Sequence, residues 1–183
     1  MTIETLAKQV QASGLAQAIA QSSWAFPTIE TVHVLAIAMV VGSIAAVDLR
    51  LLNVAWRGRP AGEVASEILP WTWVCFTVAA IAGALMFISA ASKYAVDLPF
   101  QLKMLLLVLA GANMLIFHFF GYRDVKSWTG DTSRTAKVAA ALSLAFWLGV
   151  VVCGRLVSFT TQDQFGPPTS DASDVLATSS DRA

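Results

Sequence analysis

The chain has 183 residues, of which 56% are hydrophobic and 13% are charged, and its twelve Lys and Arg balance twelve Asp and Glu. A soluble domain usually carries about 25% charged residues, so this deficit excludes an ordinary soluble domain and predicts a membrane protein. The balanced charge gives no reason to expect a nucleic-acid partner.

The N-terminal segment, residues 1–23, is predicted to hold one amphipathic helix over 2–22. Its apolar residues lie loosely on one side and Gln, Lys and Glu lie elsewhere. Such a helix is too polar to span a bilayer and suits the membrane interface. The segment lacks both a basic start and a strong apolar core, so we expect no cleavable signal peptide.

Four apolar stretches follow, and each is close to the ~20 residues that cross a ~30 Å hydrocarbon core. The short connections between them favour an up-down order. The expected fold is therefore all-α, an integral membrane four-helix up-down bundle over residues 24–160, with spans at about 27–52, 71–91, 98–121 and 136–159. The tail, 161–183, is rich in Ser, Thr, Pro and Asp and is predicted to be disordered.

Small residues four positions apart let helix backbones approach closely. Three such pairs lie inside the predicted spans and are expected at helix contacts: Ala38 with Gly42, Ala79 with Gly83, and Gly149 with Cys153.

The basic residues predict the orientation in the membrane. One side of the predicted bundle holds seven of them and the other side three, the seven being Arg50, Arg57, Arg59, Arg123, Lys126, Arg134 and Lys137. The positive-inside rule places these seven in the cytoplasm and both termini on the non-cytoplasmic side, in a bacterial inner membrane. Asp48 and Arg50 lie at this cytoplasmic end and are expected to pair with each other or with loop charges.

Glu30 and His33 lie three residues apart in the first predicted span, so they share one side of a helix. Ionisable residues at such a depth are expensive in lipid and mark functional sites. A rise of ~1.5 Å per residue puts His33 about 9 Å from the middle of its span, toward the non-cytoplasmic side. By the same count, Lys103, Met86 and Arg155 fall in that half. His33, Lys103, Arg155, Glu30 and Met86 therefore form the predicted cofactor-binding layer.

His118 lies about 12 Å from the middle on the cytoplasmic side, so the two histidines differ in depth by about 20 Å. The axial nitrogens of one haem lie only ~4 Å apart, so His33 and His118 are not expected to hold the same haem. A dimer axis along the membrane normal preserves depth and does not help. Each histidine stays a candidate metal ligand, and His118 could instead be a packing residue.

These residues also have purely structural alternatives. His33 could donate a hydrogen bond to Glu30 or to a facing backbone group. Lys103 and Arg155 could extend their charged ends to the membrane surface.

Several stretches together resemble an uncharacterised bacterial family of four-span membrane proteins. They are residues 22–33, Gly42 to Arg50, Leu69 to Trp73, and Phe100 through Asn113 to His118. The resemblance covers roughly residues 15–160 and implies a four-span fold, with no established activity.

A looser similarity is to the copper-resistance protein D family and to the HemJ-type protoporphyrinogen oxidases, which bind b-type haem. The latter have a His early in the first span and a functional Lys in a Leu-rich run, which resembles residues 102–106. The resemblance implies that His33 is the haem ligand and Lys103 the functional lysine.

Three functions stay open. The first is a haem or redox membrane protein with its site at His33, and the second is a copper-handling or other metal-handling protein. The third is a non-catalytic membrane subunit whose polar residues only specify packing. The expected partners are the lipid bilayer and either further copies of the chain or a membrane redox protein.

Overall fold

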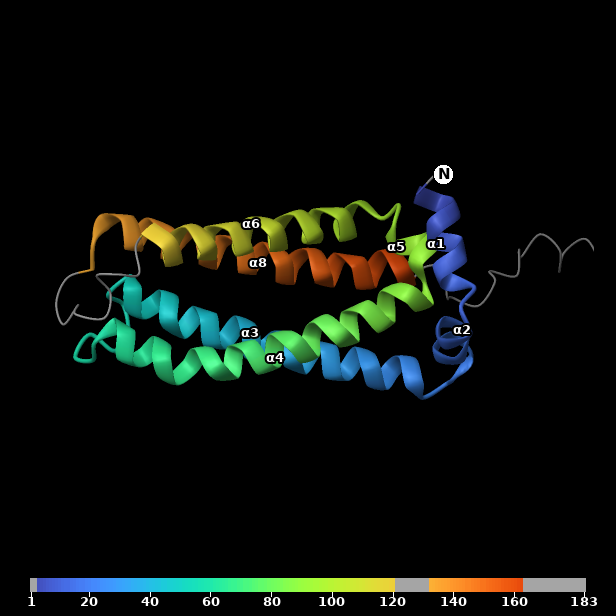
Figure 1. The fold of residues 1–183 in the computed structure, drawn as a ribbon, viewed down its shortest axis with the longest axis horizontal. Helices are drawn as coiled ribbons and strands as arrows, with labels where there is room; N and C mark the ends of the chain where they lie inside the picture. Colours follow the sequence, from blue (N-terminus) through green and yellow to red (C-terminus); the bar gives the residue numbers. More distant parts are fainter. Residues whose placement is uncertain (1–2, 121–131, 163–183) are drawn as a thin grey trace, which may run out of the picture.

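The computed structural model describes residues 3–120 and 132–162, and in these ranges all regular structure is helical (Figure 1). The all-α fold that the sequence predicts is therefore confirmed. The helices are α1 (Ile3–Gln11), α2 (Gly14–Gln21), α3 (Ala25–Leu51), α4 (Ala61–Ser89), α5 (Ala91–Tyr94), α6 (Leu98–Phe120) and α8 (Arg134–Gln162).

Four helices, α3, α4, α6 and α8, are long and apolar enough to cross a membrane, which makes the chain a multi-pass membrane protein. They form two antiparallel pairs: α3 packs against α4, and α6 packs against α8 (Figure 1). The two pairs meet mainly through α3 and α8. Their order along the chain gives the predicted up-down bundle.

The two ends of the bundle differ. At one end lie α1, α2 and α5, which we call the platform (Figure 1). The opposite end, the loop end, carries the connection between α3 and α4. A small apolar core lies near the loop end, formed by Leu51, Ala61 and Ala140 with Val47 and Leu52 packed against them.

Helix α4 begins at Ala61, well before the span predicted over 71–91. Pro70 lies inside the helix without ending it. The first turns of α4 are amphipathic, with Val64 buried and both Glu63 and Glu67 exposed. A hydropathy pattern misses these turns because their charged residues lower the average.

The single amphipathic helix expected over 2–22 is divided into α1 and α2 at Ser13. The backbone of Ser13 is extended, and its hydroxyl accepts a hydrogen bond from the N–H of Ala16 at 3.4 Å, which caps α2. Gln11 attaches α1 to α5, because its Oε1 accepts from the N–H and the hydroxyl of Ser92 at 3.1 and 2.6 Å. The platform is therefore bonded to the bundle.

Arg50 organises the loop end. It is only 1% exposed, and its guanidinium donates from Nε to the carbonyl oxygen of Arg59 at 2.6 Å and from Nη1 to Oδ1 of Asn53 at 2.9 Å. Asn53 has a positive φ of 58°, a conformation that Asn adopts more readily than most residues. Its Oδ1 also accepts from the hydroxyl of Thr132 at 3.2 Å, which ties this turn to the segment before α8.

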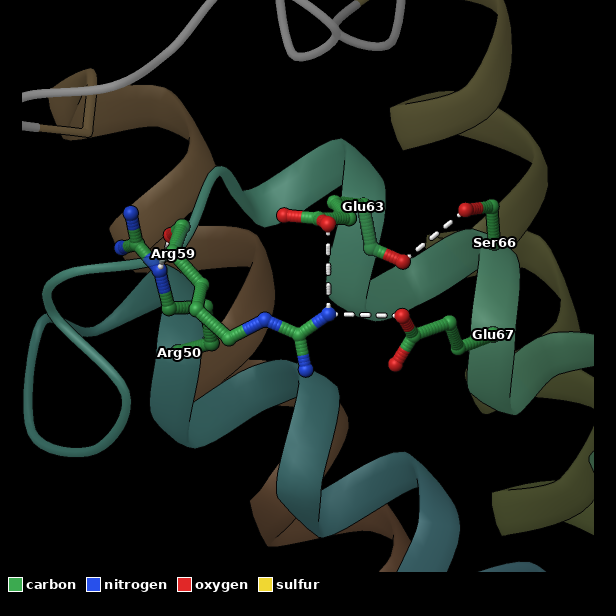
Figure 2. A network of polar contacts seen from close by, with 5 residues as sticks. All are labelled: Arg50, Arg59, Glu63, Ser66 and Glu67. Carbon is green, nitrogen blue, oxygen red and sulfur yellow. Dashed lines mark hydrogen bonds and ion pairs between the residues drawn. The ribbon is translucent and has the colours of Figure 1, made fainter.

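Arg50 does not pair with Asp48, and the acidic residues of 121–131, the other expected partners, lie outside the described residues. Figure 2 shows that Arg59 engages the acidic side chains itself, with Nη2 at 3.3 Å from Glu63 and 2.6 Å from Glu67. Among the described residues, Arg50 binds uncharged oxygens of the loop. Asp48 points elsewhere because residues two apart on a helix differ by about 200° around its axis.

Removing the guanidinium of Arg50 should loosen the loop end. We expect Arg50→Met to lower the free energy of unfolding by about 2–3 kcal/mol, because hydrogen bonds from a buried charged donor are lost. Reversible unfolding of the purified protein in detergent measures this. Arg134→Met, at an exposed position on α8, is the matched control and should change stability by less than about 0.5 kcal/mol. Equal losses in both variants would contradict the role of Arg50.

Candidate functional site

His33 lies against the backbone of α4. Its Nδ1 is 2.8 Å from the carbonyl oxygen of Ala79, so the ring donates a hydrogen bond to that oxygen. A Cβ added at Gly83 would lie 2.8 Å from Cε1 of the imidazole, closer than real Cβ contacts. The half-buried ring therefore occupies space that only a glycine at position 83 leaves open.

The small-residue pairs have different environments. The imidazole of His33 lies against Ala79 and Gly83, between α3 and α4. A Cβ at Gly149 would lie 2.9 Å from Cδ1 of Leu106, which places this glycine at the contact between α6 and α8. The third pair differs, because Ala38 and Gly42 are exposed and a Cβ at Gly42 would meet nothing within 4 Å.

Lys103 reaches the same region from α6. It is half-buried, and its Nζ is 3.7 Å from the position that a Cβ of Gly154 on α8 would take. Its charge acts on the imidazole of His33. Lys103 of α6 is thus within electrostatic range of His33 of α3, in the other helix pair.

An aromatic group lies next to this pair on the platform side. The ring centroids of Phe87, Tyr94 and Phe100 are 5.4–6.4 Å apart. Burial raises the pKa of Tyr94, and the carboxylates of Glu30 and Asp97 raise it further. Glu30 is therefore near Tyr94, and the hydrogen-bond partner of His33 is the Ala79 backbone.

The other predicted site residues are less closely associated with His33. Arg155 is exposed, and its guanidinium lies 5.2 Å from the ring centroid of Phe159, one turn along the same helix. Met86 is half-buried on α4, one turn from Gly83 toward the platform. His118 belongs to α6, but its side chain lies outside the described part.

The sequence allowed a facing backbone group as the partner of His33 but did not identify Ala79, because a backbone acceptor on another helix leaves no mark in the sequence. The pair of Ala79 and Gly83 was the available signal. Its spacing predicts a helix contact, and in the structure these small residues also leave room for the side chain of His33. Among the side chains that the structure describes, which exclude His118, no three His, Cys, Asp or Glu residues are grouped to hold a metal ion.

The fold and the polar side chains within its spans define a polytopic α-helical membrane protein with a histidine site in the platform half. The model of a family of unknown function (DUF6644) matches residues 22–160, so the chain belongs to this family. The match begins after α1 and α2, which both lie outside it. No curated protein and no solved structure matches the chain.

The fit between His33 and α4 can be tested with one methyl group. We expect Gly83→Ala to lower the free energy of unfolding by about 1–3 kcal/mol, because the new Cβ displaces the imidazole from the Ala79 carbonyl. Gly42→Ala is the matched control and should be neutral or stabilising by up to about 1 kcal/mol, since alanine favours a helix. Unfolding in detergent compares the two, and equal stabilities would refute the close contact at His33.

Proposed function

We propose that this protein binds a b-type haem through Nε2 of His33, in the platform half of the bundle, and functions as a redox protein of the membrane. One observation carries the proposal: the hydrogen bond from Nδ1 of His33 to the carbonyl oxygen of Ala79.

This hydrogen bond selects one form of the ring. A carbonyl oxygen can only accept, so Nδ1 must hold the proton, and in the neutral imidazole the lone pair is then on Nε2. Metal-binding histidines commonly donate their other N–H to a backbone carbonyl or a carboxylate, which fixes the tautomer and the orientation of the ring. The Ala79 carbonyl would do this for His33.

Haem suits the neighbourhood better than a metal ion held by side chains alone. A protein-only zinc or copper site usually takes three or four side-chain ligands, and the described residues contain no such group of His, Cys, Asp and Glu. Haem provides four nitrogen ligands itself and needs only one or two from the protein. A single oriented histidine is therefore enough.

Lys103 would supply positive charge beside the ligand. An ammonium group can pair with the carboxylates of a haem or of another anionic molecule. The resemblance to HemJ-type proteins, with a His early in the first span and a Lys in a later one, agrees with these two roles. The guanidinium of the exposed Arg155 would instead lie near the membrane surface.

When bound, haem supplies an iron that gains and loses one electron. The residues of the chain would bind and orient it: His33 would ligate the iron, Ala79 and Gly83 would support the imidazole, and Lys103 would be the nearby cation. By the positive-inside rule, this half of the bundle would lie on the non-cytoplasmic side.

The absorption spectrum of the full-length protein tests this proposal. Protein expressed with ample haem should show a Soret band, and His33→Ala should lose it because the axial nitrogen is gone. Gly83→Ala should weaken haem binding by about 10–100-fold, the usual effect of disturbing the support of a metal-bound histidine. Pyridine haemochrome and metal analysis quantify the content.

His118→Ala is the matched control, because it removes the only other histidine of the chain. It should keep the band. A wild-type protein without a Soret band would refute the proposal and favour a packing role for His33, and bound copper without haem would support a metal-handling protein.

A further inference from the structure

Asp48 is a buried carboxyl that the proposed haem site does not use. It lies on α3 near the loop end and is only 6% exposed. Ser143 on α8 is the side chain that acts on this carboxyl. Within the described part of the chain, Oδ2 of Asp48 is buried and has no hydrogen-bond partner.

No cation among the described residues compensates this carboxyl. Arg50 lies on another side of α3 and bonds to Arg59 and Asn53. The charged side chains on the helices that pack against α3 are engaged or placed elsewhere. On α4, Glu63 and Glu67 contact Arg59. On α8, Arg155 lies over the ring of Phe159 and Arg134 is exposed. Lys137, also on α8, has contacts of its own. Among the described residues, Ser143 is the side chain that acts on Asp48.

We propose that Asp48 is a proton-binding site, whose carboxyl carries a proton in the folded protein while Ser143 holds the other oxygen. An ionised carboxylate without a partner is very costly in an apolar interior, and the neutral acid avoids that cost. Inside a membrane, such a group is the kind of residue that proton-moving proteins use.

A proton fits this site better than a metal cation. Hard cations take about six oxygen ligands or more, whereas the described surroundings of Asp48 offer one carboxyl and one hydroxyl. The adjoining core is apolar, formed by Val47, Leu51 and Ala140. A proton needs no further ligand.

The site is independent of the proposed haem site. Asp48 follows His33 by fifteen residues on the same helix, a rise of about 22 Å. It faces α8, whereas His33 contacts α4. Failure of haem binding therefore leaves this inference intact.

Infrared spectroscopy of the full-length protein in lipid nanodiscs tests it. At neutral pH, wild-type protein should show the C=O stretch of a protonated carboxylic acid, which shifts in deuterium oxide and is absent from Asp48→Asn. Ser143→Ala should shift the band without removing it. Glu63→Gln, at an exposed carboxylate paired with Arg59, is the control and should leave the band unchanged.

Stability provides the second readout. Asparagine resembles the neutral acid in shape and charge, so Asp48→Asn should keep the unfolding midpoint of wild type. The inference is overturned if wild type lacks the band, if the band persists in Asp48→Asn, or if that variant is strongly destabilised. A sodium-dependent stability at constant ionic strength that Asp48→Asn abolishes would also overturn it, in favour of a metal cation.

Discussion

The contact between the imidazole of His33 and the backbone of α4 sets the geometry of the bundle. A polar ring at this depth must find a hydrogen-bond partner inside the protein, and on an apolar helix the nearest acceptor is a backbone carbonyl. Reaching the Ala79 carbonyl requires that residue 83 have no side chain. A second bond, from Thr72 to Ser43 at 2.8 Å, holds the same two helices nearer the loop end. The register of α3 against α4 is thus fixed at two heights.

The same rule governs most polar side chains of the spans. Asn113 donates to the carbonyl oxygen of Ala139 at 2.9 Å, which joins α6 to α8 as His33 joins α3 to α4. Each helix pair therefore has a side chain that bonds to the backbone of its partner helix. Asp48 departs from the rule, since one of its oxygens stays without a partner among the described residues. This departure is the physical reason to expect a proton there.

The sequence predicted the membrane class and the four spans, because hydropathy and helix length determine them. It did not predict the direction, around the helix axis, in which each side chain points. Arg155 lies two residues beyond the buried Cys153, which turns it about 200° away from the face of α8 that contains Cys153. The same angle separates Asp48 from Arg50. Depth follows from counting residues, whereas direction depends on which helices become neighbours.

Helix α3 carries both unusual side chains, and distance limits how strongly they influence each other. Two unit charges about 22 Å apart interact by roughly 0.8 kcal/mol at an effective dielectric constant of about 20. This corresponds to a change of about fourfold in an equilibrium constant. Direct electrostatics would therefore couple a charge change at His33 only weakly to the proton on Asp48. Strong coupling would require movement of α3, which packs against α4 at His33 and against α8 at Asp48 and is the main link between the two helix pairs.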